Sequence, residues 1–419
     1  MGYIQERGCF VRGATSFFVF FVFKIENLKK VVIHPKKEDA IGRRHPWIFS
    51  GAILKNEDSP EDGDVVEVFS AKGKYLATGH WHDGSIAIRI FSFEPTDAGQ
   101  QFWNEKVANA FNFRQKTGLT DSKSTNCYRL INAEGDGLPG LIIDVYDKTA
   151  VVQCHTVGMH RSRHEIAKAV MEQYDGELRG VFDKSAETLP ERYAATVKNG
   201  YLSGQSGPSK VLENDHLFQV DWEGGQKTGF FLDQRDNRAL LANYAAGKKI
   251  LNAFCYSGGF SVYALHAGAT EVHSVDVSAK AIELTEKNIQ LARPFAGAHQ
   301  SFTADVMQFL KNSTEEYDVM IVDPPAFAKN ISKRHNAVQG YKRLNALAME
   351  KVSKGGFLFT FSCSQVVDRQ LFYDTILAAA IEAGRPVRVL HHLSQPADHP
   401  VNIFHPEGAY LKGLVLEIG

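Results

Sequence analysis

The 419-residue sequence has almost no net charge, few cysteines and no long apolar run. A formal net charge of −1 creates no overall field that would attract nucleic acid, so any nucleic-acid site must be a local patch. The five cysteines form no CxxC pair and no zinc-ligand spacing with histidine. This predicts no metal site and is typical of a reduced, cytoplasmic protein with free thiols.

The longest apolar run, residues 16–23, is much shorter than the ~20 residues that a membrane-spanning helix needs. No small-residue cleavage site follows the run, which disfavours a signal peptide. We expect an edge strand or an extension ahead of the first domain, and no membrane partner.

Two patterns of secondary structure divide the chain. Short strands separated by turn signals predict a small β-barrel near the N-terminus. From about residue 248, strands alternate with helices, which indicates a parallel sheet and an α/β fold class. The predicted domains are an N-terminal extension (1–28), a barrel (29–96), a small middle α+β domain (97–205) and a C-terminal Rossmann-like domain (206–419).

Two segments depart from these patterns. Residues 186–210 are polar and rich in turn residues, and we expect a flexible loop there. The late strands predicted at 386–391 and 410–417 have no long helix between them, which favours antiparallel pairing.

Polar residues end successive predicted strands of the C-terminal domain. The turn containing Gly258 lets the backbone approach a ligand at the positive end of a helix. Asp276 ends the next strand, where an acid can accept hydrogen bonds from a ribose diol. The turn is not GxGxxG, which disfavours a dinucleotide and favours S-adenosylmethionine, because this cofactor has the diol but no pyrophosphate. Asp305, after the third strand, would meet the adenine amino group.

The segment from Gly225 to Arg238 precedes a predicted helix and is dense in donors and acceptors. One interpretation is a lid, with Lys227, Asp233 and Arg235 near the charged amino-acid end of the cofactor. The alternative is only a capped helix start, with Asp233 as N-cap.

Two short motifs carry the predicted chemistry. Asp323-Pro324-Pro325-Ala326-Phe327 and Ser362-Cys363-Ser364 each follow an apolar run typical of a buried strand. Adjacent strand ends of a parallel sheet share one crevice, so the acid and the thiol should face the same ligand. This pairing suggests chemistry on a flat, nitrogen-rich ring. A lone cysteine after a buried strand can also be an inert core residue.

At this point the sequence resembles a known family. Its residues 29–419 are similar to the class I S-adenosylmethionine-dependent 23S ribosomal RNA cytosine-5 methyltransferases with an N-terminal PUA domain. The motifs that carry the resemblance are His45 to Gly51, Glu134 to Leu141, Gly225 to Arg238, Asn252 to Phe260, Asp323 to Phe327, Ser362-Cys363-Ser364 and Asp398-His399-Pro400.

The resemblance implies a PUA barrel, a small middle α+β domain and a methyltransferase domain that modifies carbon 5 of a cytosine in large-subunit ribosomal RNA. The catalytic residues would be Cys363 and Asp323. The predicted cofactor-binding residues are Lys227, Thr228, Phe230, Asp233, Arg235, Asn252, Phe254, Tyr256, Gly258, Asp276, Ser278, Asn288, Asp305, Asp323 and Pro324. The predicted RNA-binding residues are Lys36, Lys37, Arg43, Arg44, Trp47 and Phe327.

Carbon 5 of cytosine becomes nucleophilic once a thiolate adds at carbon 6, and Cys363 is the predicted thiolate. Asp323 would bind the ring at N3, and Phe327 could stack on a base that has left its stack. Some related enzymes have a second cysteine that helps to release the product, but here Ala326 stands at that position. The base that removes the carbon-5 proton is therefore left open. Cys255 is expected to be structural.

Two alternatives remain at this level. An Asp-Pro-Pro-aromatic turn also suits a methyltransferase that acts on the amino group of adenine and needs no cysteine. A non-catalytic RNA-binding assembly factor could keep the same fold. The sequence leaves open which cytosine is modified, whether naked RNA or an assembly intermediate is recognised, and whether the chain forms a homodimer.

Overall fold

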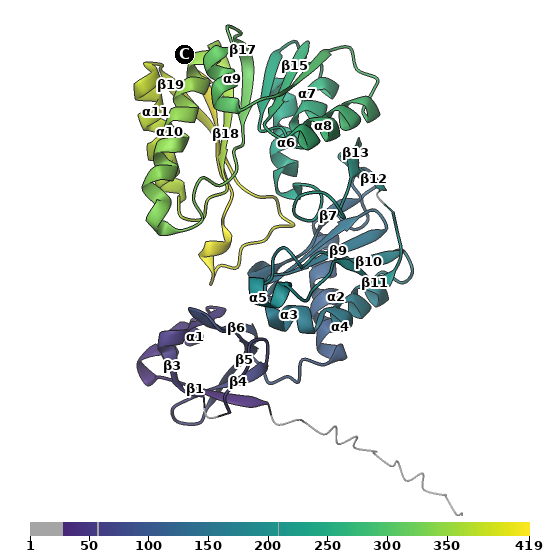
Figure 1. Cartoon of the computed structure of the whole chain (residues 1–419), viewed down its shortest axis with the longest axis vertical. Coiled ribbons are helices and arrows are strands. Elements are labelled where there is room, and N and C mark those ends of the chain that lie inside the picture. Colours follow the sequence, from purple (N-terminus) through teal and green to yellow (C-terminus); the bar gives the residue numbers. More distant parts are fainter. Residues whose placement is uncertain (1–27, 57, 208) are drawn as a thin grey trace, which may run out of the picture.

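The computed structural model describes residues 28–56, 58–207 and 209–419, so the predicted extension lies outside it except for residue 28. The described residues form β-sheets of six, five, two and seven strands. They run from the N-terminal sheet to the large sheet that contains the C-terminus (Figure 1). Within the described residues, no helix is long and apolar enough to cross a membrane.

The N-terminal domain is a sheet with the strand order β2-β6-β5-β4-β1-β3, and it curls around its own core (Figure 1). Buried and part-buried residues alternate along β4, because successive side chains of a strand point to opposite faces. Its elements are β1 (Lys29–Ile33), α1 (Glu38–Gly42), β2 (Trp47–Phe49), β3 (Ile53–Lys55), β4 (Val65–Ser70), β5 (Tyr75–Trp81) and β6 (Ile86–Ser92).

The middle part is a five-stranded sheet with the order β11-β10-β9-β8-β7, and α2 and α4 pack together beside it. Its elements are α2 (Gln100–Lys116), β7 (Cys127–Asn132), β8 (Leu141–Tyr146), β9 (Thr149–Cys154), α3 (Val157–Arg161), α4 (Arg163–Gln173), β10 (Gly180–Asp183), α5 (Glu191–Ala194) and β11 (Gly200–Gly204).

The prediction of a flexible loop at 186–210 is wrong. The segment contains α5, and β11 adds an edge strand that pairs antiparallel with β10. The glycines at both ends of β11 hide the strand in the sequence, because glycine is rare within strands. The ring of Tyr201 packs on Phe182, with ring centroids 5.0 Å apart, and this tertiary contact holds the edge in place.

A hairpin that the sequence did not reveal links the middle and C-terminal sheets. It consists of β12 (Ser209–Glu213) and β13 (His216–Val220), which pair antiparallel. The connecting residues Asn214 and Asp215 have φ angles of 49° and 65°. Asparagine and aspartate tolerate this left-handed region, which a two-residue hairpin turn of type I′ requires at both positions.

The C-terminal domain is a seven-stranded sheet with the order β16-β15-β14-β17-β18-β20-β19. All neighbours are parallel except β20, which is antiparallel to β18 and β19, so the predicted antiparallel pairing is confirmed. The elements are α6 (Arg235–Leu241), β14 (Lys249–Ala253), α7 (Gly259–His266), β15 (Glu271–Asp276), α8 (Ala279–Leu291), β16 (Ala298–Thr303), α9 (Val306–Asn312), β17 (Tyr317–Val322), α10 (Arg334–Lys351), β18 (Val352–Ser362), α11 (Arg369–Ala383), β19 (Val387–Leu393) and β20 (Lys412–Ile418).

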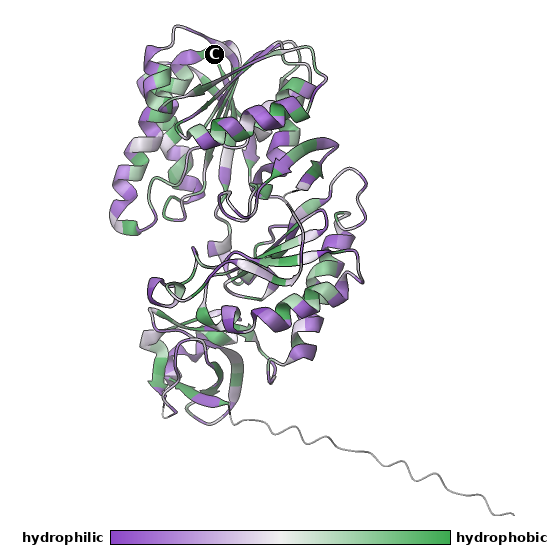
Figure 2. Cartoon of the chain, turned by 45° about the vertical axis from the view of Figure 1, so that its right-hand side comes forward, coloured by the Kyte–Doolittle hydropathy of each residue, from purple (hydrophilic) through white to green (hydrophobic). Residues whose placement is uncertain are grey.

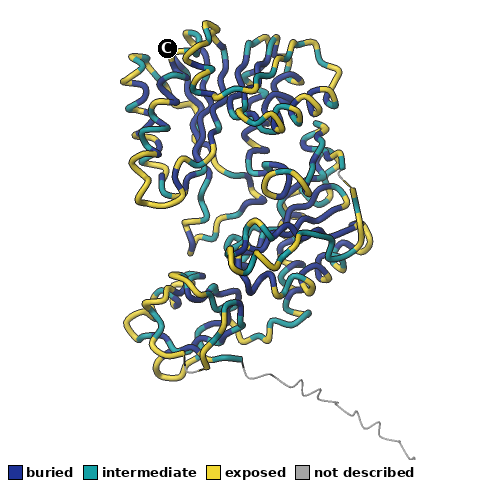
Figure 3. The backbone as a smooth tube through the Cα atoms, viewed as in Figure 1, coloured by how far each residue is buried: buried dark blue, intermediate teal, exposed yellow. Residues whose placement is uncertain are grey.

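Hydrophobic cores lie on both sides of this sheet, and buried residues follow the central strands in Figure 3. One core continues into the middle sheet, where Tyr146 and Phe182 join Phe218 and Leu241. Figure 2 shows the same strands mostly in the apolar colour and the outer helices in mixed colours. The middle and C-terminal domains are thus held together by shared apolar packing, whereas the N-terminal sheet has a core of its own.

Candidate active site

The turn after β14 has an unusual backbone. Phe254, Tyr256 and Gly258 all have positive φ angles, of 62°, 46° and 74°. Strained non-glycine residues of this kind cluster at functional sites. The carboxylate of Asp276, at the end of β15, accepts hydrogen bonds from the backbone N–H groups of Tyr256 (3.1 Å) and Ser278 (2.9 Å). Asp276 therefore ties the turn to the start of α8.

The donors and acceptors at this edge fit a nucleoside cofactor. Asp276 is only half-buried, so its carboxylate keeps lone pairs for a ribose diol. The next residue, Val277, is 70% exposed and offers an apolar surface beside that acid. A flat base could cover this side chain, which otherwise gains nothing from its position.

Several predicted cofactor residues have structural contacts in the described chain. The side chains of Ser278 and Asp305 cap α8 and α9. The amide of Asn252 donates to Ser261 Oγ (2.9 Å). Asn288 accepts from the backbone of Gln219 (2.8 Å) and donates to the Ser257 carbonyl (2.8 Å), which supports the turn from below. Their contact with the cofactor stays a prediction, as does that of Pro324.

In the segment from Gly225 to Arg238, the predicted lid, two residues differ from the prediction. Asp233 does not cap a helix, because α6 begins at Arg235 after Gln234, which makes no side-chain cap. Arg235 is buried, and its terminal nitrogens donate to both carboxylate oxygens of Asp398 at 2.9 and 2.8 Å. Arg235 therefore has a structural role, and its predicted contact with the cofactor is not supported.

The neighbours of Asp233 have different surroundings. Thr228 is buried and donates to Asp144 (2.5 Å), and Phe230 lies in the core with the Arg238 guanidinium 4.7 Å from its ring centroid. Phe230 and Lys227 both line a cavity. Within this segment, only Lys227 and Asp233 offer a charged group to a ligand in that cavity.

The predicted catalytic acid and thiol lie at the ends of the adjacent parallel strands β17 and β18. The hydroxyl of Ser364 donates to the Ala328 carbonyl (2.7 Å), so the two loops that follow these strands are joined. The amide of Gln234 donates to Asp323 Oδ2 (2.8 Å). The lid segment, the acid and the thiol therefore form one connected unit.

Burial dominates the protonation of both groups. It raises the pKa of Asp323 to about 7, and the nearby charge of Asp233 adds to the effect. Burial and the two carboxylates raise the pKa of the Cys363 thiol to about 11. At neutral pH, the thiol is protonated and the acid is close to half protonated in this state.

The ammonium group of Lys412 acts against the rise in the pKa of the Cys363 thiol. Lys412 on β20 pairs in register with Ser362, and its Nζ donates to the carbonyls of Ser364 (2.6 Å) and Tyr410 (2.9 Å). Its charge lowers the pKa of the Cys363 thiol. Lys412 is itself buried, and burial lowers its own pKa to about 8. Nothing in the local sequence around position 412 signals this role.

Cys363 opens onto a cavity of about 710 Å³ that all three domains line. This volume is typical of pockets that bind small molecules or single nucleotides. The residues that matter here are Trp47 and Arg89 from the N-terminal sheet, Arg129, Asn132 and Glu134 from the middle domain, and Lys227, Asp233, Lys329, Cys363, His399, Pro400, His405 and Tyr410 from the C-terminal domain.

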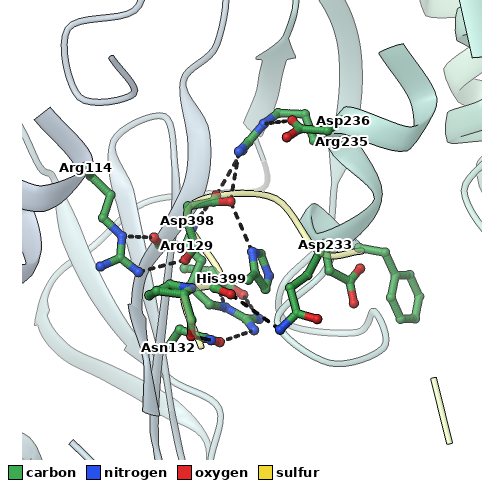
Figure 4. A network of polar contacts seen from close by, with 12 residues as sticks. Arg114, Arg129, Asn132, Asp233, Arg235, Asp236, Asp398 and His399 are labelled. Carbon is green, nitrogen blue, oxygen red and sulfur yellow. Dashed lines mark hydrogen bonds and ion pairs between the residues drawn. The ribbon is translucent and has the colours of Figure 1, made fainter. Parts of the chain in front are cut away.

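Asp398 joins the domains behind this cavity. Besides the pair with Arg235, its carboxylate accepts from the backbone N–H of Arg129 (3.0 Å) and contacts His399 Nδ1 (3.1 Å), and its carbonyl accepts from Arg114 (2.7 Å). Figure 4 shows Asp398 between Arg114 and Arg235. The sequence alone indicates no role for the Asp398-His399-Pro400 motif. We call Asp398, Arg114, Arg129, Arg235 and His399 the Asp398 cluster.

Trp47, a predicted RNA-binding residue, is part of the cavity wall. Its indole N–H donates to Glu134 (2.8 Å), and its ring centroid lies 4.3 Å from that of His405. The Arg89 guanidinium lies 5.3 Å from the Trp47 ring centroid.

The other predicted RNA-binding residues remain at least partly exposed. Lys36, Lys37, Arg43 and Arg44 lie on the surface of the N-terminal domain. Phe327 packs on Tyr341, with ring centroids 4.6 Å apart, and keeps 36% of its surface exposed. Their contact with RNA stays a prediction.

Comparisons with known proteins give a consistent picture. Residues 31–93 match the PUA-like domain family, and residues 183–415 match a family of S-adenosylmethionine-dependent methyltransferases. Curated proteins named "Ribosomal RNA large subunit methyltransferase I" are similar along almost their whole length. The protein from Tolumonas auensis is 38% identical over 92% of this chain and 98% of its own, and that from Aeromonas hydrophila is 38% identical over 91% and 97%.

Solved structures support the fold. A SAM-dependent methyltransferase structure from Streptococcus mutans has a TM-score of 0.79 at 24% identity, over 93% of this chain and 100% of its own. A methyltransferase structure complexed with SAH has a TM-score of 0.80 at 24% identity, over the same shares of both chains.

Proposed function

The chain belongs to the S-adenosylmethionine-dependent methyltransferase family named ribosomal RNA large subunit methyltransferase I, and on this premise we propose that it methylates carbon 5 of a cytosine in large-subunit ribosomal RNA. The observation that carries the proposal is the placement of Cys363 beside Asp323, on adjacent strand ends, where the thiol opens onto a cavity. A methyltransferase that acts on an amino group needs no such thiol.

The cofactor would be held by the strained turn at Phe254–Gly258 and by Asp276. When bound, it supplies the methyl group that carbon 5 takes up. Asp276 would hold the ribose diol, and Val277 would cover one face of the adenine. Lys227, in the cavity wall, would meet the carboxylate of the cofactor.

Cys363 performs the covalent step in this proposal. Its thiol gives its proton to water as the substrate arrives, and the thiolate forms a bond to carbon 6 of the ring, whose double-bond electrons move toward N3. Asp323, in its protonated form, donates a hydrogen bond to N3 and stabilises the charge that develops there. Lys412 stabilises the thiolate through its ammonium charge.

Product release needs a base, because carbon 5 must lose its proton before the bond between carbon 6 and sulfur breaks. Ala326 cannot supply one. Asp233, which the sequence placed beside the cofactor, lines the cavity and accepts from the Tyr410 hydroxyl through Oδ2 (2.7 Å). Its Oδ1 is buried and has no hydrogen-bond partner in the described chain. We assign the removal of the carbon-5 proton to the Asp233 carboxylate.

The test is a methylation assay on large-subunit RNA with a labelled methyl donor, followed by nucleoside analysis and mapping of the modified position. We expect 5-methylcytidine, and we expect Cys363→Ala to abolish it. Formation of N6-methyladenosine, or full activity of Cys363→Ala, would contradict the proposal.

The proposal places the chain in the cytoplasm, with ribosomal RNA as its partner. The sequence leaves open whether the chain forms a homodimer, and sedimentation of the purified chain tests this.

A further inference from the structure

The loop that connects β19 to β20, residues 394–411, forms one wall of the cavity and is held at several points. It leaves the C-terminal sheet and runs toward the N-terminal domain (Figure 1). Asp398 fixes its first half through Arg235, and Tyr410 fixes its end through Asp233. Between these points, the Pro400 carbonyl accepts from Asn132 (3.0 Å).

The tip of this loop is a β-turn from Asn402 to His405, closed by a hydrogen bond from the His405 N–H to the Asn402 carbonyl (2.8 Å). The Asn402 side chain stabilises the turn from both sides. Its Oδ1 accepts from the Phe404 N–H (3.0 Å), and its Nδ2 donates to the Glu134 carbonyl (3.3 Å). The His405 ring packs on Trp47. The turn is therefore anchored to both other domains.

The two corner residues of this turn are Ile403 and Phe404, which are 85% and 47% exposed. Turn corners usually carry glycine, proline, asparagine or aspartate. Ile403 contributes almost nothing to the core, since it stays in water after folding, and Phe404 keeps about half of its apolar surface in water. An apolar corner on a rigid turn therefore points to a binding partner.

The position of the corner identifies that partner. Pro400 and His405, on either side of it, line the same cavity as Cys363, so Ile403 and Phe404 lie at its rim. Cations that RNA phosphates would require also line this cavity, namely Lys227 and Lys329. Arg89 and Arg129 line it too, and they are paired with Glu134 and Asp144.

We propose that Ile403 and Phe404 form a wedge that enters the base stack of the RNA and fills the gap left by the cytosine that swings toward Cys363. The inference rests on the proposed function. A base inside a helix must leave its stack before an enzyme can modify it. Proteins that open a base step insert side chains such as isoleucine and phenylalanine. A protein partner fits less well, because two side chains fall far short of the roughly 800 Å² per partner of a stable interface.

The test compares two RNAs that contain the mapped cytosine, one with the cytosine paired in a hairpin and one with it unpaired. The double variant Ile403→Ser/Phe404→Ser of the full chain should lose about ten- to a hundredfold in kcat/KM on the paired RNA, since unstacking costs a few kcal/mol. On the unpaired RNA it should stay within about twofold of the unaltered chain. Ile381→Ser, on the exposed face of α11, is the matched control and should change neither.

A binding measurement separates the wedge from catalysis. In the hairpin, 2-aminopurine beside the cytosine should brighten when Cys363→Ser binds, and this signal should disappear when Ile403→Ser/Phe404→Ser is added. Three results would each overturn the wedge. The first is an equal loss of kcat/KM on both RNAs, and the second is a 2-aminopurine signal that Ile403→Ser/Phe404→Ser does not change. The third is a sedimentation coefficient that differs between the double variant and the unaltered chain, which would reveal a second copy of the chain as the partner. Failure of the proposed function would appear separately, as the absence of 5-methylcytidine with the unaltered chain on either RNA.

Discussion

Asp398 and Asp323 are two aspartates near the same cavity with opposite electrostatics. Burial raises the pKa of both, but at Asp398 the contacts with His399 and with the Arg235 guanidinium outweigh burial and hold the pKa well below its usual range. Asp323 has the neutral Gln234 as its hydrogen-bond partner and the acid Asp233 as a neighbour, so its pKa rises to about 7. One aspartate stabilises the arrangement of domains, and the other gives up stability for chemistry.

The largest predicted effect comes from removing the paired aspartate. Asp398→Ala leaves the buried Arg235 with only its 3.6 Å contact to the exposed Asp236. This should cost about 3–5 kcal/mol in the free energy of unfolding, measured with urea. Arg388→Ala removes an ion pair with Glu417 on the surface and should cost less than about 0.5 kcal/mol. A loss below about 1 kcal/mol for Asp398→Ala would show that the Asp398 cluster does not hold the domains.

Unlike Asp398→Ala, Asp323→Asn should raise the free energy of unfolding, and it should lower the activity. The rate of methyl transfer should fall about 10²–10³-fold, as for other groups that stabilise developing charge. Because the folded-state pKa of about 7 lies above the ordinary carboxyl pKa of 3.8, ionisation of Asp323 costs stability as the pH rises from about 3.8 to about 7.

At pH 8, Asp323→Asn should therefore unfold with about 4 kcal/mol more free energy than the unaltered chain, since each pKa unit is worth about 1.4 kcal/mol. The difference should disappear below about pH 3, where Asp323 is protonated in both states. Asp374→Asn, at an exposed position of α11, is the control for the loss of a carboxylate. A stability gain that does not depend on pH would contradict this account of Asp323.

The alkylation rate of the Cys363 thiol depends on the charges around it, because they change its pKa. Lys412→Met removes the ammonium that lowers the pKa of Cys363, so alkylation of Cys363 at pH 8 should slow several-fold, as followed by peptide mass spectrometry. Asp323→Asn should speed the same reaction, because it removes a carboxylate that raises the thiol pKa. Lys354→Met, at an exposed position of β18, should leave the rate unchanged. Equal rates in all four proteins would remove Lys412 from the mechanism.

The smallest effect is expected on the N-terminal surface. Lys36→Ala/Lys37→Ala should weaken RNA binding a few-fold at low salt and reduce the slope of log affinity against log salt by about 1–2. The measurement is a salt titration of binding to large-subunit RNA, with Lys354→Ala as the control. An unchanged slope would exclude these two lysines from the RNA contact.

The strand ends were predictable, because apolar runs followed by Asp276, Asp323 and Cys363 repeat a local pattern that places polar groups on one edge of a sheet. The Asp398 cluster was not, since its arginines lie at positions 114, 129 and 235, and no local periodicity links them to position 398. The same holds for Lys412, whose role depends on its register with β18. Arg235 was misplaced because a charge in a polar motif carries no sign of the partner that buries it.

The most direct test of the central claim is a trap with RNA in which 5-fluorocytidine replaces the mapped cytosine. Fluorine at carbon 5 cannot leave as a proton, so the bond between carbon 6 and sulfur should persist after methyl transfer. The account predicts a covalent complex that survives denaturing electrophoresis, carries the labelled methyl group and maps to Cys363. A methylated RNA with no covalent complex, or a complex that persists in Cys363→Ala, would contradict it.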